Sequence, residues 1–134
     1  MMTNEFADSC IYTIVEAEKL AKAAAAGGRT TFSEKRPWVT GHDLWQQATR
    51  QNLRVPVLFA DAADCTRLLY WGALSGVRLD GASTRYTLDR VRKLSGRHAP
   101  QELTLRSTGK KIAPNFIRPY AICITPLFLE GNRA

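Results

Sequence analysis

Hydrophobic positions along the chain fall into short runs of the kind that form strands. The longest run covers residues 67–79, where aromatic and branched side chains dominate and Gly72 and Gly76 interrupt them. Glycine inside a strand often marks a bulge, a sharp bend, or a place where a ligand or another backbone comes close. A second apolar run, Val55–Ala60, precedes it. We expect these two runs to be neighbouring strands at the centre of one sheet.

Three further segments carry strand patterns. Ile11–Val15 is apolar and branched, Glu102–Arg106 alternates between polar and apolar residues, and Tyr120–Thr125 is a short apolar run bounded by prolines. Alternation with a period of two is typical of a half-buried strand. Residues 29–39 are polar, and we expect a loop or an edge strand there.

Helical patterns separate these runs. Residues 16–26 are rich in strong helix formers and end at Gly27 and Gly28, which suit a left-handed cap. A second helix is expected over residues 40–52. A third, short helix is expected over residues 87–94, because three apolar residues there have helical spacing while basic residues fall between them: Leu88, Val91 and Leu94 against Arg90, Arg92 and Lys93.

Short strands with intervening helices and no regular βαβ alternation predict an α+β fold. We expect a small, partly closed β-barrel with short helices packed outside it. With 134 residues, the chain is expected to form a single domain over residues 1–134, long enough to bury an ordinary core.

Composition bears on the cellular location and on the state of the cysteines. No apolar run approaches the roughly 20 residues that span a bilayer, and residues 1–9 lack the basic start of a secretory signal. We therefore expect a cytoplasmic protein with no membrane partner. The three widely spaced cysteines, Cys10, Cys65 and Cys123, form neither a disulfide framework nor a metal motif, and we expect free thiols in the core. We expect no metal and no cofactor.

Charge is distributed unevenly along the chain. Residues 1–84 contain nine basic and nine acidic side chains, whereas residues 85–134 contain ten basic and three acidic ones. The net charge of +7 therefore comes from the last fifty residues. Such asymmetry favours a polyanionic partner, of which nucleic acid is the commonest. Many basic proteins have no such partner, so charge leaves the question open.

An aromatic set interleaved with basic residues sharpens the nucleic-acid hypothesis. Unpaired bases bind by stacking on aromatic rings while cations hold the phosphates. Because side chains alternate along a strand, one of Tyr70 and Trp71 is expected to fill core, and Gly72 beside Trp71 favours Trp71 as the ligand contact. The candidate stacking residues are Trp38, Trp71 and Tyr120, and the candidate phosphate contacts are Arg36, Lys110, Lys111 and Arg118.

Other chemistry has less support in the pattern. The segment Ser107–Lys111 lacks the upstream glycine and the following hydroxyl of a phosphate-binding loop, although a basic turn there suits contact with a nucleic-acid backbone. His42 and His98 are isolated and are expected at the surface. The strand-end acids Asp61, Asp64 and Asp80 suit turns as well as acid–base chemistry.

The strand residues 69–74 (Leu-Tyr-Trp-Gly-Ala-Leu), with the preceding run 56–60 and the closing strand 118–123 (Arg-Pro-Tyr-Ala-Ile-Cys), resemble the PUA-like superfamily by order of elements. That superfamily includes the PUA, ASCH, EVE and YTH domains. The resemblance implies a small barrel that binds RNA or holds a flipped, modified base. ASCH domains carry a Gly-x-Lys-x-x-Glu-x-Arg motif, and residues 28–36 have similar residue types at a different spacing.

Three functions therefore stay open. The leading hypothesis is a nucleic-acid-binding module that recognises RNA, DNA or a modified base in an aromatic pocket beside a basic face. The alternatives are a small hydrolase acting on a nucleoside-like substrate, with Glu34, Lys35 and Thr31 as candidate catalytic residues, and a protein-interaction or inhibitor domain. The sequence leaves the oligomeric state undetermined.

Overall fold

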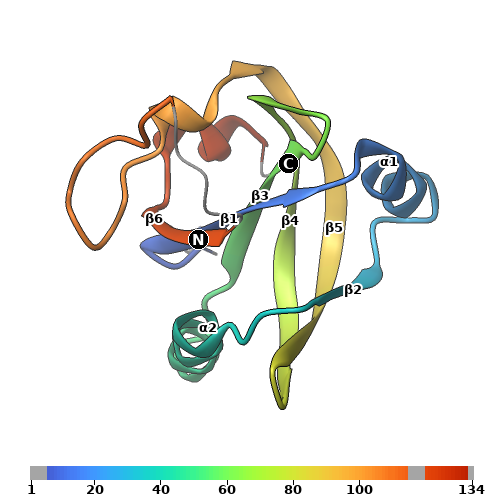
Figure 1. The fold of residues 1–134 in the computed structure, drawn as a ribbon, viewed down its shortest axis with the longest axis vertical. Coiled ribbons are helices and arrows are strands. Elements are labelled where there is room, and N and C mark those ends of the chain that lie inside the picture. The colour runs from blue at the N-terminus through green and yellow to red at the C-terminus, as the bar shows by residue number, and fades with distance from the viewer. Residues whose placement is uncertain (1–5, 115–119, 133–134) are drawn as a thin grey trace.

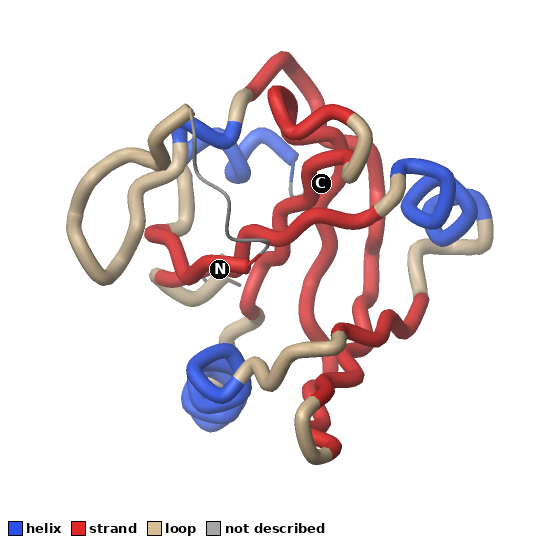
Figure 2. Tube along the Cα trace, viewed as in Figure 1, coloured by secondary structure: helices blue, strands red, loops and turns tan. Residues whose placement is uncertain are grey.

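The computed structural model describes residues 6–114 and 120–132. Two helices and one mixed sheet make up most of this part of the chain, which confirms the α+β class (Figures 1 and 2). The elements in order are β1 Ser9–Val15, α1 Ala17–Ala25, β2 Thr30–Glu34, α2 Val39–Arg50, β3 Val55–Asp61, β4 Asp64–Asp80, β5 Ser83–His98, the 3₁₀ turn η1 Pro100–Glu102, β6 Tyr120–Ile124 and the 3₁₀ turn η2 Leu127–Asn132.

The strand order in the sheet is β2-β5-β4-β3-β1-β6. β1 pairs with β3 in parallel, and the other neighbours are antiparallel. As expected, β3 and β4 are neighbours at its centre, and residues 30–34 form an edge strand. Over the described residues the sheet is open, with β2 and β6 at its two edges. In Figure 1, β1 and β2 both cross in front of the long strands β4 and β5.

Apolar side chains are buried on both faces of the sheet. One core contains residues of α1 and α2 with Trp38 and Tyr86, and the other contains Trp71 with the segments around η1 and η2. Every residue from Val55 to Ala60 is buried. A continuous apolar run of this kind is typical of a strand that is covered on both sides.

The long hairpin of β4 and β5 replaces the third helix expected over residues 87–94. Arg90 has a positive φ of 57°, and the pairing with β4 shifts between Trp71 and Ala73. The extra residue of this bulge brings Leu88 and Val91, three apart, into the same core. Their spacing therefore imitates a helix although the backbone is extended.

Two further expectations need correction. Residues 102–106 form no strand of the sheet, since a 3₁₀ turn ends at Glu102 and isolated bridges follow at Thr104 and Leu105. The cysteines also differ from one another: Cys10 and Cys123 lie opposite each other in β1 and β6 and are buried, but Cys65 is exposed. Among the described residues, no helix has the length and apolar character needed to cross a bilayer.

Candidate functional site

A cavity of about 740 Å³ lies where the sheet remains open, between α1, the end of β1 and the free edge of β2. We call it the α1–β2 cavity. Its volume is in the range of pockets that hold small organic ligands. Its lining residues come from β1 and the turn after β3 (Ile14, Val15, Ala62), from α1 and its flanks (Glu16, Lys19, Lys22, Ala23, Ala26), and from β2 and β5 (Arg29, Thr30, Thr31, Phe32, Ser33, Glu34, Tyr86).

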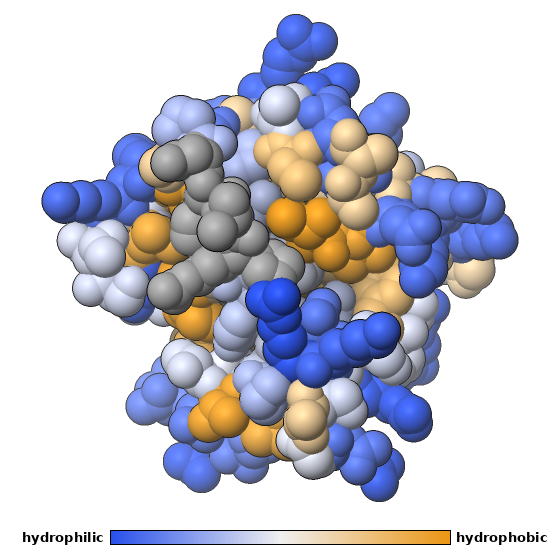
Figure 3. All heavy atoms as spheres, viewed as in Figure 1, coloured by the Kyte–Doolittle hydropathy of each residue, from blue (hydrophilic) through white to orange (hydrophobic). Residues whose placement is uncertain are grey.

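The apolar side of the cavity is formed by Phe32 and Tyr86, which lie opposite each other in β2 and β5. Phe32 is half-buried and presents its ring to the cavity, while Tyr86 is buried and supports that ring from behind. Their ring centroids are 5.8 Å apart, and Phe32 also contacts Phe59 edge-on at 6.0 Å. Tyr86 stacks on Trp38 at 4.2 Å. Because each ring packs on another ring, the aromatic wall is held in one orientation. Figure 3 shows apolar surface beside strongly hydrophilic side chains on this face.

Glu34 supplies a carboxylate to the same cavity. It is half-buried at the end of β2, and its Oε1 accepts a hydrogen bond from the backbone N–H of Lys35 at 3.2 Å. Burial raises the pKa of Tyr86, and the negative charge of Glu34 raises it further. Tyr86 is therefore a neutral phenol at physiological pH, and Glu34 offers an acceptor for an N–H or O–H donor.

Exposed cations lie at the rim of the cavity. Lys19 and Lys22 of α1 pair with Glu16 and Glu18 at 3.2 and 3.8 Å, and Arg29 pairs with Asp89 at 3.4 Å. Each of these three basic side chains is more than 60% exposed. Exposed pairs of this kind contribute only about 0–1 kcal/mol, so an anionic ligand can replace the carboxylate at little cost.

The tryptophans that the sequence suggested as stacking walls are fully buried. Trp38 lies between the rings of Tyr86 and Tyr120, at 4.2 and 4.6 Å, inside the first core. Trp71 lies in the second core against Phe6, whose ring meets it edge-on at 5.5 Å. The expectation that either ring faces a ligand is corrected, because both faces of the sheet are covered and no ring surface remains open.

Tyr120 is partly buried, and its hydroxyl would lie only 2.7 Å from a Cβ added at Gly41. Burial raises the pKa of Tyr120 to about 12. Tyr120 therefore closes the aromatic stack from β6, and it is not among the residues of the α1–β2 cavity. Its role as a stacking residue for a ligand stays a prediction.

The predicted phosphate contacts are dispersed. Arg36 is exposed just after β2, with its carbonyl accepting the Thr84 hydroxyl at 2.7 Å. Lys110 and Lys111 are exposed in the segment after η1, and the Lys111 ammonium donates to the Glu102 carbonyl at 2.9 Å. Arg118 lies outside the described residues. The α1–β2 cavity contains none of the three described cations, whose phosphate contacts stay predictions.

Two of the three candidate catalytic residues, Thr31 and Glu34, line the α1–β2 cavity, and Lys35 does not. The Thr31 hydroxyl is 3.1 Å from that of Thr87, Lys35 is exposed beyond the end of β2, and Glu34 lies in the cavity. Within residues 6–114 and 120–132, acidic, histidine and cysteine side chains nowhere gather in threes at a distance that holds a metal ion. The arrangement suits binding of an aromatic, hydrogen-bonding and anionic ligand.

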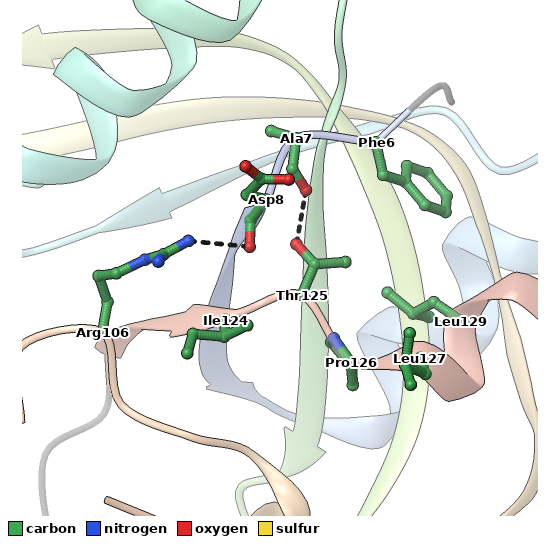
Figure 4. A pocket seen from close by; sticks show the side chains of 9 residues that line it. All are labelled: Phe6, Ala7, Asp8, Arg106, Ile124, Thr125, Pro126, Leu127 and Leu129. Atoms are coloured by element: carbon green, nitrogen blue, oxygen red, sulfur yellow. Dashed lines mark hydrogen bonds between the residues drawn. The ribbon is translucent and has the colours of Figure 1, made fainter. Parts of the chain in front are cut away.

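A second hollow, of about 320 Å³, lies between the start of β1 and the end of β6. Figure 4 shows its polar groups engaged with each other: the Arg106 guanidinium donates to the Asp8 carbonyl at 3.1 Å, and the Thr125 hydroxyl donates to the Ala7 carbonyl at 2.7 Å. Arg106 also donates to the Ser9 hydroxyl at 2.9 Å. These bonds join β1 to the C-terminal segments, so we assign this hollow a structural role.

Sequence reasoning missed most of the cavity, including Phe32, Tyr86, Lys19, Lys22 and Arg29. The sequence did contain one signal: Phe32 is the apolar residue at the centre of the polar segment 30–34, as expected of an edge strand with one buried face. The pairing of β2 with β5, which brings Tyr86 beside it, has no local signal. Comparisons of the chain with protein-family models, with curated proteins and with solved structures find no match.

Proposed function

We propose that this protein binds single-stranded nucleic acid and that an unpaired base enters the α1–β2 cavity. The observation that carries the proposal is the composition of that cavity: the half-buried Phe32 ring backed by the buried Tyr86, the Glu34 carboxylate, and weakly paired cations at the rim. Single-strand recognition combines aromatic rings that stack on bases, polar groups that hydrogen-bond base edges, and cations that hold the phosphates. Contact between a base and an aromatic wall is worth about 1–3 kcal/mol.

A PUA-like architecture is part of this proposal. Its support is the curl of the sheet, because Trp38 contacts Tyr86 of β5 and Tyr120 of β6, which lie four strands apart in the strand order. The cavity then lies at the seam where a barrel of this kind would close. The free edge of β2 turns backbone N–H and C=O groups into that seam, where they can contact a base edge.

The test is a variant that fills the cavity without touching the core. Ala62 lines the cavity, is exposed, and uses its backbone N–H in a bond to the Val15 carbonyl at 3.2 Å, which a larger side chain retains. Ala62→Trp should weaken binding of fluorescently labelled single-stranded RNA or DNA roughly 5- to 150-fold, as measured by anisotropy. Ala21→Trp is the matched control, since Ala21 is exposed on α1 and does not line the cavity. Equal affinities for the two variants would refute the base-binding role.

A nucleoside-like substrate is the second candidate, and the position of Glu34 in the cavity favours it. A carboxylate beside an aromatic wall can act as a general base or acid on a bound nucleoside. Release of free base from a nucleoside panel, measured by chromatography, tests this function. Glu34→Gln should abolish turnover while preserving binding. A panel without any product would leave binding as the function of the cavity.

A further inference from the structure

We infer that a second surface, on the outer face of β2, β5 and β4, binds the phosphate backbone of the nucleic acid. Its centre is a row of three residues that lie side by side across the strands: Ser33 is paired with Arg85, and Arg85 is paired with Arg78. We call this the arginine row. The inference rests on the proposed function, and it goes beyond it because none of these residues except Ser33 lines the α1–β2 cavity.

Both guanidinium groups of the row are available to a ligand. Arg85 is exposed between the buried residues Thr84 and Tyr86, and Arg78 is exposed next to the buried Val77. Over the described part of the chain, neither arginine forms an ion pair or a side-chain hydrogen bond. Asp80, two residues beyond Arg78 on β4, is not an ion-pair partner of either arginine. Other cations do have such a partner, among them Lys19, Lys22, Arg29, Arg106 and Lys111.

The pairing itself is unfavourable for folding. Like charges directly opposite each other on antiparallel strands repel, and side chains at such positions lie close together. Neither core uses Arg78 or Arg85, so packing does not explain why both positions are arginine. A pair that opposes folding and remains exposed is expected where a ligand supplies the missing negative charge.

The surroundings of the row suit a phosphate backbone. In the next outward-facing positions, Thr87 of β5 is paired with Thr31 of β2 on one side and with Gly76 of β4 on the other. A Cβ added at Gly76 would meet only Thr87, at 4.0 Å. Small and hydroxyl-bearing side chains therefore adjoin the row. Arginine forms paired hydrogen bonds with phosphate oxygens, and hydroxyl side chains are common further contacts.

Two more cations flank the row. The buried Thr84 donates its hydroxyl to the Arg36 carbonyl at 2.7 Å and accepts a bond from the Trp38 N–H at 2.8 Å. These bonds hold the segment after β2 against β5, so the exposed Lys35 and Arg36 lie near the end of the row that contains Ser33. Since Ser33 belongs to both the row and the cavity lining, a bound strand can cross β2 from one to the other.

The test compares two double variants of equal net charge. R78S/R85S removes the row, and R50S/R97S removes two exposed arginines elsewhere, at the end of α2 and near the end of β5. Affinity for a labelled single-stranded oligonucleotide is measured by anisotropy at several salt concentrations. For R78S/R85S we expect the slope of log affinity against log salt to become shallower by about 1.4, from about 0.7 per lost phosphate contact. For R50S/R97S we expect a smaller change.

Thermal melting of both double variants separates binding from folding. R78S/R85S should melt at or above the wild-type temperature, because it removes a repulsive pair. Equal salt slopes for the two double variants, with Ala62→Trp still impaired, would overturn the arginine row and leave the proposed function standing. A wild type that binds no oligonucleotide at low salt would overturn both. Binding of heparin alone would assign the row to another polyanion and overturn the inference.

Discussion

Two regions of this molecule are rich in basic side chains, and the fold treats them differently. In the described residues 98–114 and 120–125, two cations are bound by other parts of the chain: Arg106 donates to Ser9 and Asp8, and Lys111 donates to the Glu102 carbonyl. On the outer face of β2, β5 and β4, Arg78 and Arg85 face each other, and within the described residues neither has an ion-pair partner. The first region uses charge to hold segments together, while the second leaves it available.

The difference shows why a count of charges along the sequence does not locate a binding surface. The net excess of basic residues lies in residues 85–134, yet several of these cations are committed to structure. Arg78 belongs to the half of the chain with balanced charge and gains its importance only by pairing with Arg85. The two regions differ in whether their basic side chains are free to bind a ligand, which depends on ion pairing and hydrogen bonding within the chain.

Trp71 gives the largest expected effect, because it fills the core on which the first region packs. It is fully buried against Phe6, and the Arg92 guanidinium lies 5.5 Å from its ring centre. Trp71→Ala should lower the free energy of unfolding by about 3–5 kcal/mol, measured by urea denaturation. Trp45→Ala, at a half-buried position on α2, is the control and should cost less. A stable Trp71→Ala protein with lost nucleic-acid binding would restore Trp71 as a ligand contact.

The burial of both tryptophans also shows what the sequence could and could not predict. The runs at 55–60 and 67–79 were predictable as central strands from their apolar and branched residues. Alternation suggested that one of Tyr70 and Trp71 faces a pocket, but that inference assumes a sheet with one open face. Here both faces are covered, partly by segments around η1 and η2 that are distant in sequence, so no local pattern could reveal the burial of Trp71.

The helix expected at residues 87–94 failed for a related reason. A bulge at Arg90 changes which residues share a face of β5, and bulge formation depends on the partner strand and on α1. The Gly28 carbonyl accepts the Val91 N–H at 2.8 Å, and an added Cβ at Gly28 would lie 2.9 Å from the Val91 nitrogen. The end of α1 therefore packs on the bulge. Such a contact between distant segments has no periodic signature.

Arg106 gives the next largest effect. Arg106→Ala removes its hydrogen bonds to the Ser9 hydroxyl and the Asp8 carbonyl and leaves the buried Ser9 without that donor. We expect a loss of roughly 1–3 kcal/mol in the free energy of unfolding. The salt dependence of oligonucleotide binding should change little below the melting temperature. A shallower salt slope with unchanged stability would instead place Arg106 among the nucleic-acid contacts.

Glu102 makes the same region sensitive to acid. Its hydrogen bond from His98 at 2.9 Å, followed by one from the Ala99 N–H at 2.8 Å, lowers the pKa of Glu102 from its usual 4.5. A carboxyl whose pKa is lower in the folded state stabilises the fold above the unfolded-state pKa and loses that contribution as the pH falls through the folded-state pKa. Wild type should therefore lose more thermal stability than Glu102→Gln between neutral pH and pH values below 4.5. Parallel melting curves for the two proteins across this range would contradict the assignment.

Lys110 should give the smallest effect, and it tests where the boundary between the two regions lies. It is exposed in the segment after η1, and its backbone N–H donates to the Thr108 hydroxyl at 3.2 Å, so its side chain is dispensable for that turn. The sequence made Lys110 a candidate phosphate contact, but neither the cavity nor the arginine row includes it, so we now expect Lys110→Ala to leave oligonucleotide affinity nearly unchanged. Arg85→Ser, which removes the same charge, should make the salt slope shallower by about 0.7. Equal reductions for both variants would extend the nucleic-acid path to the C-terminal cations, because each would then neutralise a phosphate.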